Sequence, residues 1–237
     1  MPHWDVSKTS YRFVNRLALN AIVKTYGQAK RISHFNLLVH ENICEAIYMT
    51  RHLNGDYIEI GVYKGGSALT AVNFIDELAL VEPGLAARKV WLLDTFDGFN
   101  YEAAKNSPDA IWCGTHGLFG VEGTIAFIRE TLSATSTPVE ILENNIVSDE
   151  FPAGIRKISV ANIDVDLYEP TIRALQKIAP LMELGGIIIC EDPASTPGLY
   201  GALLAMEEFL ESPQGVDYMK IFKGGQYLLL KLTATEL

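Results

Sequence analysis

The chain has 237 residues, of which 49% are hydrophobic, and its formal net charge is −10. This length suits one domain with an added helical segment and is ample for a sizeable core. An acidic chain is a poor candidate for binding nucleic acid or an anionic membrane. Its three cysteines lie far apart, which argues against a disulfide framework and favours a reducing compartment.

The N-terminal region is predicted to be helical. Apolar residues recur at helical spacing between about Tyr11 and His52. The first residues lack the apolar run of a secretory signal, and the longest apolar runs of the chain are too short to span a bilayer. We therefore expect a cytoplasmic protein with a helical extension over residues 1–52 and a main domain over residues 53–237.

The main domain is predicted to alternate strands with helices. The predicted strands are residues 57–61, 89–94, 139–143, 157–164 and 185–192, followed by a strand pair within 218–232 that is joined at Gly224–Gly225. This order predicts an α/β fold with a mostly parallel sheet, helices on both faces and one antiparallel C-terminal strand. In such a sheet, ligands bind beyond the carboxyl ends of the strands.

The stretch "EIGVYKGGS" is a candidate ligand-binding turn. Gly61 and Gly65 lie between a predicted strand and a predicted helix, where glycine lets the backbone approach a ligand closely. The spacing matches neither a dinucleotide fingerprint nor a P-loop. Glu59, two residues before Gly61, would repel a pyrophosphate and suits a ligand with an ammonium or sulfonium group. An ordinary strand–helix turn is the alternative.

Asp94 ends the second predicted strand, where an acid can accept both hydrogen bonds of a ribose diol. The segment that follows, about residues 100–120, is irregular and rich in glycine, proline, asparagine and aromatic residues. A long structureless stretch is usually functional or mobile, so we expect a mobile lid. His116 lies in it and could reach an active site, although a surface-loop histidine is the favoured interpretation.

The stretch "ANIDVDLYEP" ends a buried strand in two acids. Asp164 and Asp166 alternate, so along an extended chain they face the same side. A right-handed crossover makes strands 157–164 and 185–192 parallel, and if they are neighbours, Asp164 can approach Glu191 and Asp192. Oxygen ligands suit Mg²⁺, Mn²⁺ or Ca²⁺. The alternative is that these acids only cap helices.

Taken together, these motifs resemble those of the macrocin O-methyltransferase family, over roughly Phe35 to Leu232. The resemblance rests on Glu59-x-Gly61-x-x-x-Gly65, Asp94-Thr95-Phe96-x-Gly98, Asp164-x-Asp166-x-Tyr168-Glu169-x-Thr171 and Glu191-Asp192. It implies a Rossmann-like class I methyltransferase sheet. It also implies use of S-adenosyl-L-methionine and a divalent cation such as Mg²⁺ to methylate a hydroxyl of a sugar or phenolic natural product.

The resemblance also assigns residues to roles. The metal ligands fall on Asp164, Glu191 and Asp192, and the proton acceptor on Asp164 or Asp166. The methyl-donor contacts fall on Glu59, Gly61, Ser67, Asp94 and Asn145. The family usually has Asp-Asp where this chain has Glu191-Asp192, so the longer glutamate would shift the metal or bind it differently. The N-terminal helices resemble a region used for subunit contacts, which implies a homo-oligomer.

Two other functions remain open at this point. An NAD-dependent sugar oxidoreductase would use a similar sheet, but the dinucleotide fingerprint is absent and the acids are unexplained. A non-catalytic nucleoside-binding domain would keep the fold, yet it would not need acids at two strand ends. Binding of S-adenosylmethionine or of NAD distinguishes these classes.

Overall fold

The computed structural model describes residues 10–27, 37–195 and 200–233. The strands are β1 (Asp56–Ile60), β2 (Val90–Asp94), β3 (Val139–Glu143), β4 (Ile158–Ile163), β5 (Met182–Cys190), β6 (Tyr218–Lys223) and β7 (Gln226–Lys231). They form one seven-stranded sheet in the order β3-β2-β1-β4-β5-β7-β6. The first five run parallel, and β7 runs antiparallel to β5 and to β6, which confirms the predicted architecture.

The described α-helices are α1 (Ser10–Gly27), α3 (Leu37–Met49), α4 (Gly66–Ala79), α5 (Gly120–Thr131), α6 (Tyr168–Ile178), α7 (Asp192–Ser195) and α8 (Tyr200–Glu211). Shorter 3-10 turns are η2 (Pro83–Ala87), η3 (Ala104–Asn106), η4 (Pro108–Trp112), η5 (Ala179–Leu181) and η6 (Gly215–Asp217). The N-terminal region, predicted to be helical, contains the helices α1 and α3. Its residues 1–9 and 28–36 lie outside the described parts.

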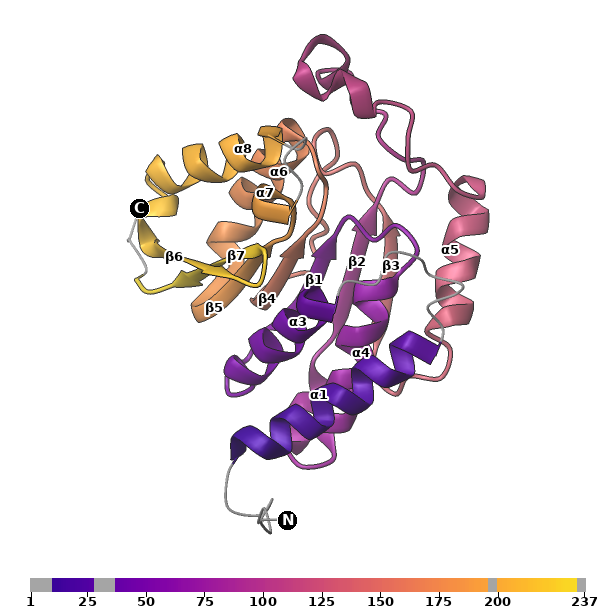
Figure 1. The fold of residues 1–237 in the computed structure, drawn as a ribbon, viewed down its shortest axis with the longest axis vertical. Coiled ribbons are helices and arrows are strands. Elements are labelled where there is room, and N and C mark those ends of the chain that lie inside the picture. Colours follow the sequence, from indigo (N-terminus) through magenta and orange to yellow (C-terminus); the bar gives the residue numbers. More distant parts are fainter. Residues whose placement is uncertain (1–9, 28–36, 196–199, 234–237) are drawn as a thin grey trace.

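The sheet lies between two helical layers (Figure 1). Helices α1, α3, α4 and α5 share an apolar core with one face of the strands, and α6 and α8 share a second core with the other face. Strand alternation explains the division, since Tyr57 faces the first core while Ile58 and Ile60 face the second. The N-terminal helices therefore pack on the same core as the strand–helix turn that follows β1.

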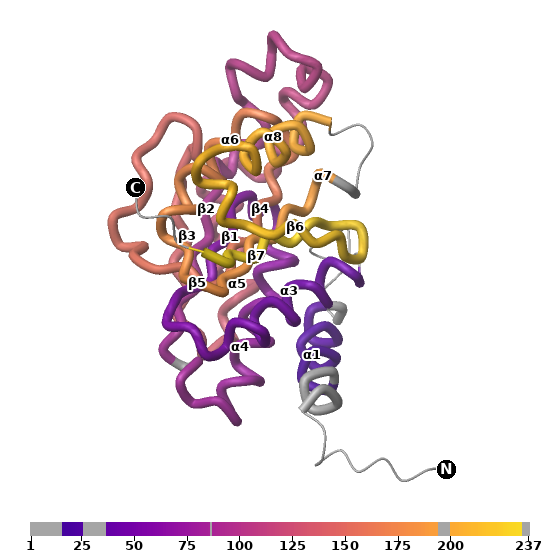
Figure 2. The backbone as a smooth tube through the Cα atoms, turned by 90° about the vertical axis from the view of Figure 1, so that its left-hand side faces the viewer, coloured from indigo at the N-terminus to yellow at the C-terminus, as the bar shows by residue number. Residues whose placement is uncertain are grey.

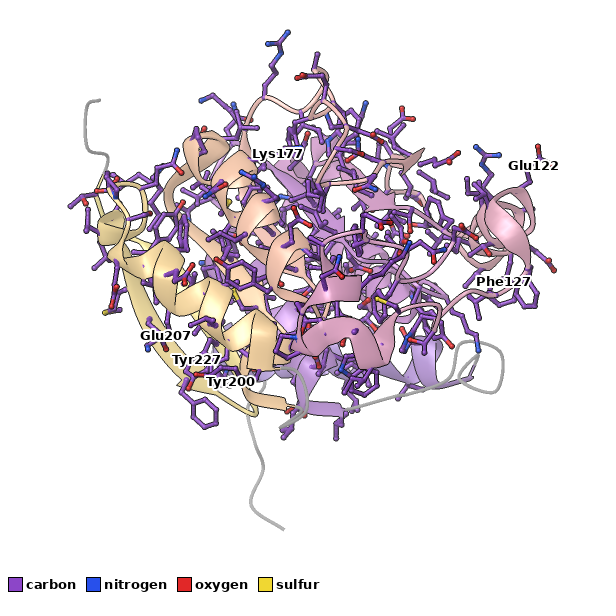
Figure 3. All side chains as sticks on the ribbon, turned by 90° about the horizontal axis from the view of Figure 1, so that it is seen from above. Glu122, Phe127, Lys177, Tyr200, Glu207 and Tyr227 are labelled. Atoms are coloured by element: carbon purple, nitrogen blue, oxygen red, sulfur yellow. The ribbon has the colours of Figure 1, made fainter. Side chains whose placement is uncertain are left out.

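Two local features shape the C-terminal hairpin and hold helix α6 in place. Gly224 and Gly225 join β6 to β7 with φ of 57° and 87°, the left-handed conformation that a two-residue hairpin turn requires. The ammonium of Lys177 on α6 donates to the carbonyl oxygens of Ile146 (2.6 Å) and Asp149 (2.7 Å), which ties α6 to the loop after β3 (Figure 3).

In the described part of the chain no helix is both long and apolar enough to cross a membrane.

Candidate active site

A cavity of about 580 Å³ opens at the carboxyl ends of β1, β2, β4 and β5. It lies where β1 has β2 on one side and β4 on the other, the switch point at which open α/β sheets bind ligands. Its walls include Gly61, Asp94, Asp164 and Asp192, together with residues of the 100–120 segment. The sheet topology thus brings the predicted turn and the predicted acids to one cavity.

The turn after β1 is held against the loop after β4. Gly61 has a φ of 87°, and a Cβ placed there would collide with the carbonyl oxygen of Asp164. Its N–H donates to the Leu93 carbonyl at 3.0 Å. Glycine is therefore required at this position, both for the backbone conformation and for the close approach of the two loops.

Asp94 accepts hydrogen bonds from three backbone N–H groups. Val62 (2.6 Å) and Tyr63 (3.0 Å) donate to its Oδ2, and Phe96 (2.8 Å) donates to its Oδ1. An ionised carboxylate has about four lone-pair sites, so Asp94, which lines the cavity, retains capacity for a ligand hydroxyl. The contact with a ribose stays a prediction, but the structure adds a second role: Asp94 shapes the turn.

Glu59 is fully buried, and its link to the cavity runs through Ser67. The hydroxyls of Tyr57 and Ser67 each donate to the Glu59 carboxylate at 2.8 Å, and Ser67 lines the cavity. Burial raises the pKa of Glu59 to about 7, although Ser67, Tyr57 and Asn162 act to lower this pKa. The Asn162 amide lies near enough for that effect but makes no hydrogen bond within the described residues.

Three acids meet at the β4–β5 end of the cavity. Carboxylate oxygens of Asp164, Asp166 and Asp192 lie within 4.8 Å of one another. Burial, and next the nearby Glu191, raises the pKa of Asp164 well above its usual range. Burial, and next Asp166 and Asp164, does the same for the pKa of Asp192. A set of oxygen ligands that repel one another fits a hard cation such as Mg²⁺.

The predicted ligand set and the observed cluster differ in one member. Glu191 lines the cavity but does not belong to the group of three, whereas Asp166 does. Asp166 has a φ of 60°, and its backbone N–H donates to Asp192 Oδ2 at 2.7 Å. The turned backbone, and not extended alternation, brings Asp166 to the cluster.

Backbone strain gathers around the cavity. In the described chain the non-glycine residues with positive φ are Tyr63, Phe96, His116 and Asp166, and all four line the cavity. Such conformations persist only where the surroundings enforce them, and they cluster at functional sites. The His116 ring packs on Phe99 (4.6 Å between centroids) and Tyr63 (5.4 Å), so this histidine belongs to the cavity wall and is not only a surface-loop residue.

Sequence reasoning missed several wall residues. Asn144, and not the predicted Asn145, lines the cavity; the Asn145 carboxamide oxygen accepts the N–H of Val147 at 3.0 Å. Tyr101 also lines the cavity, and burial, then Asp94 and Asp166, raises the pKa of its hydroxyl. An aromatic residue in an irregular segment gives no local signal of this position.

The cavity residues lie within a stretch that matches a known family. Residues 23–217 match the macrocin-O-methyltransferase family, TylF. The chain belongs to this family. The resemblance drawn from the motifs is therefore confirmed.

Two curated relatives from Streptomyces are similar to this chain. One, from Streptomyces olivaceus, is named 8-demethyl-8-(2,3-dimethoxy-alpha-L-rhamnosyl)-tetracenomycin-C 4'-O-methyltransferase; it is 28% identical over 181 residues, covering 73% of this chain and 64% of that protein. The other, demethyldecarbamoylnovobiocin O-methyltransferase from Streptomyces niveus, is 26% identical over 171 residues, covering 66% of this chain and 60% of that protein. The matches thus span just under two thirds of the relatives' length.

Among solved structures, that of the O-methyltransferase NovP is similar with a TM-score of 0.68 and 17% sequence identity. The match covers 95% of this chain and 100% of that chain. At this identity the likeness establishes the fold, which is the methyltransferase sheet that the sequence predicted.

Proposed function

We propose that the protein transfers a methyl group from S-adenosyl-L-methionine to a hydroxyl of a sugar or other natural-product small molecule, with assistance from a divalent cation. The observation that carries the proposal is the contact between the glycine turn and the acidic loop, where Gly61 packs on the Asp164 carbonyl. Through this contact, the turn that we expect to bind the methyl donor lies beside the acids that we expect to bind the cation, in one cavity. Family membership and the two named relatives support the same reaction class.

The donor half of the cavity comprises Gly61, Ser67 and Asp94. Gly61 gives the sulfonium substrate close access to the backbone, and Asp94 offers its remaining lone pairs to the ribose hydroxyls. Glu59 acts behind Ser67 and sets the orientation of that hydroxyl. On the adenine side we retain Asn145 as predicted and add Asn144, which lines the cavity.

The acceptor half comprises the acidic cluster. Asp164, Asp166 and Asp192 would hold the cation, with Glu191 beside them, and the bound cation supplies a Lewis acid that lowers the pKa of an acceptor hydroxyl. Asp164 or Asp166 takes the hydroxyl proton. The oxygen then forms a bond to the methyl carbon as the carbon–sulfur bond breaks, and the chain's main contribution is alignment of the two reactants.

We also propose a homo-oligomer, assembled through the N-terminal helices. Leu19 and Val23, four positions apart on α1, are 59% and 58% exposed, so they form an apolar pair on one helix face that a second copy of the chain would cover. Light scattering at micromolar concentration checks this, and a monomer mass would contradict it.

A paired binding and turnover experiment tests the function. Calorimetry is run with S-adenosylmethionine and, separately, with NAD, and methyl transfer is followed by mass spectrometry over a panel of glycosylated and phenolic acceptors with Mg²⁺ or EDTA. We expect binding of S-adenosylmethionine, no binding of NAD, and transfer that EDTA abolishes and Mg²⁺ restores. Binding of NAD instead would favour an oxidoreductase, and donor binding without transfer to any acceptor would favour a sensing domain.

A further inference from the structure

The 100–120 segment is held by hydrogen bonds at its base, by a carboxylate at its far side, and by packing of Tyr101 and Ala104 on Leu167. At its base, Phe99 N–H donates to the Thr115 carbonyl (3.1 Å) and Gly114 N–H donates to the Phe99 carbonyl (3.0 Å). These bonds bring the two ends of the loop together. In Figures 1 and 2 the part of the chain that holds the intervening turns η3 and η4 projects at the top of the molecule, above α6 and α8.

The second attachment is a single buried carboxylate at the far side of the loop. Asp109, in η4, is 6% exposed, and its Oδ2 accepts the backbone N–H of Tyr168, the first residue of α6, at 2.9 Å. An acid is favoured there by the N–H groups and dipole of the helix. Ser107 orients η4, because its Oγ accepts the Asp109 N–H at 3.1 Å.

The carboxylate also fills the space above a glycine of α8. A Cβ placed on Gly201 would lie 2.6 Å from both carboxylate oxygens of Asp109 and 2.9 Å from the Tyr168 nitrogen. Any side chain at position 201 would therefore displace Asp109. The carboxylate thus occupies a seat formed by the starts of α6 and α8, and the seat exists because residue 201 is glycine.

The seat adjoins the loop that carries the acidic cluster. Asp164 and Asp166 lie in the short connection between β4 and α6, and Tyr168, which donates to Asp109, ends that connection. Leu167 is fully buried against Tyr101 and Ala104 of the 100–120 segment. Docking of the segment therefore fixes the same four-residue connection, 164–167, that positions two of the three clustered carboxylates.

We propose that Asp109 is a positioning residue whose docking between the starts of α6 and α8 couples closure of the 100–120 segment to the geometry of the acidic cluster. The inference rests on the proposed function only for its effect on cation binding and turnover. The docking itself concerns the chain alone and can be measured without any ligand.

The most informative variant is Gly201→Ala. Alanine has a higher helix propensity than glycine. If Gly201 has no docking role, the substitution should therefore stabilise α8 and leave the 100–120 segment unchanged. If Gly201 forms the seat, the added methyl group displaces Asp109, although the sequence of the 100–120 segment itself is unchanged. The matched control is Gly84→Ala, since a Cβ at Gly84 meets no atom within 4 Å.

The companion variants are Asp109→Ala and Asp109→Asn. The first removes the acceptor, whereas the second keeps an oxygen that can accept the Tyr168 N–H and should restore most of the docking. Glu102→Ala removes a carboxylate from the same segment, but that side chain is 84% exposed, so it serves as the control.

Hydrogen exchange of the ligand-free chain, followed by mass spectrometry, is the first readout. We expect Gly201→Ala and Asp109→Ala to speed exchange in residues 100–113 by about tenfold, the effect of one lost hydrogen bond. Gly84→Ala, Glu102→Ala and Asp109→Asn should stay near the wild type. Wild-type exchange in Gly201→Ala and Asp109→Ala would overturn the docking, whether or not the chain methylates anything.

Dependence on Mg²⁺ is the second readout. The Mg²⁺ concentration that gives half-maximal turnover should rise about three- to tenfold in both docking variants, as expected for loss of a contact that only orients the ligands. The affinity for S-adenosylmethionine should stay within about twofold, because the donor residues belong to other loops. Faster exchange with an unchanged Mg²⁺ requirement would overturn the coupling and leave the proposed function intact.

Discussion

Asp94 at the end of β2 and Asp164 just beyond the end of β4 lie on the same edge of one sheet, but their surroundings differ. Asp94 accepts hydrogen bonds from Val62, Tyr63 and Phe96. Asp164 lies within reach of Asp166 and Asp192, and burial, followed by the charges of Glu191 and Asp166, raises its pKa. Around Asp94 the protein supplies hydrogen-bond donors to the carboxylate, whereas around Asp164 it adds further carboxylates.

The difference teaches how an acidic residue can be assigned a role. A carboxylate that accepts several backbone N–H bonds is stabilised in its charged form and holds a turn in shape. Carboxylates buried beside one another are stabilised only by protons or by a cation. Gly61 packs on the Asp164 carbonyl where the two regions meet, so both regions line one cavity and variants of each can be compared in the same assays.

The largest expected effect comes from Asp164→Asn. We expect turnover to fall by two orders of magnitude or more, roughly the cost of losing a charged group that stabilises the transition state. Affinity for S-adenosylmethionine should change little, because its predicted contacts lie on the other region. Steady-state kinetics and calorimetry on the same preparation measure both quantities.

The control for that variant is Asp97→Asn, which removes an exposed acid just after β2. It should retain wild-type turnover. Full turnover of Asp164→Asn in the presence of EDTA would rule out a cation at the cluster, whatever the melting temperature does.

The next effect is expected from Asp94→Ala. Loss of the carboxylate leaves three backbone N–H groups without their partner and removes the predicted ribose acceptor, so donor affinity should weaken by about 1–3 kcal/mol. The melting temperature should fall as well. Unchanged donor affinity by calorimetry would mean that Asp94 only shapes the turn.

Much of this architecture was readable from the sequence because it depends on local patterns. Short apolar runs located the strands, and the strand–helix order predicted the parallel sheet and the C-terminal hairpin. The convergence of Asp164 and Asp192 followed from one rule, that a right-handed crossover makes two strands parallel. Each of these inferences uses residues that are near in sequence or joined by a single crossover.

The missed features depend on contacts between distant segments. Asp109 docks on Tyr168, 59 positions away, and no periodicity marks that pairing. Asp166 joined the cluster through a left-handed backbone, which is uncommon outside glycine and so was not expected. His116 and Tyr101 reach the cavity only because the irregular segment folds over it, and composition alone does not fix such a path.

A smaller effect is expected for the pH dependence of stability. The pKa values of Asp164 and Asp192 are raised in the folded state, so the folded chain binds more protons than the unfolded chain above the ordinary aspartate pKa. Stability should therefore be greatest at acid pH and fall as the pH rises through the folded pKa values.

Mg²⁺ should reverse that loss of stability at alkaline pH. At pH 8, a concentration ten times the dissociation constant should raise the melting temperature by about 3–5 °C, from mass action alone. Asp192→Asn should lose this response. Differential scanning fluorimetry across pH 5–8, with and without Mg²⁺, measures it, and a melting temperature that ignores Mg²⁺ at every pH would count against the cation.

The smallest expected effect is that of Glu59→Gln. Glu59 is buried behind Ser67, and its pKa is raised to about 7 from an ordinary value of 4.5. Glutamine resembles the protonated acid and still offers an oxygen to Tyr57 or Ser67, so donor affinity should stay within about twofold. Glu59 is fully buried like the acids of the cluster, but it accepts hydrogen bonds from the protein like Asp94. The variant thus tests which of these two features governs its effect on stability.

The pH dependence of the stability difference between Glu59→Gln and the wild type distinguishes these two cases. Between pH 4.5 and 7 the folded wild type binds more protons at Glu59 than the unfolded chain, so it loses stability as the pH rises, whereas Glu59→Gln cannot. The melting temperature of the variant minus that of the wild type should therefore increase through this window and level off above it. Both chains share the acidic cluster, so its contribution to the difference reduces to the repulsion between Glu59 and Asp164, which the variant removes and which acts in the same direction. A constant difference from pH 5 to pH 8 would mean that the hydroxyls of Tyr57 and Ser67 fully offset the burial of Glu59, which would group it with Asp94.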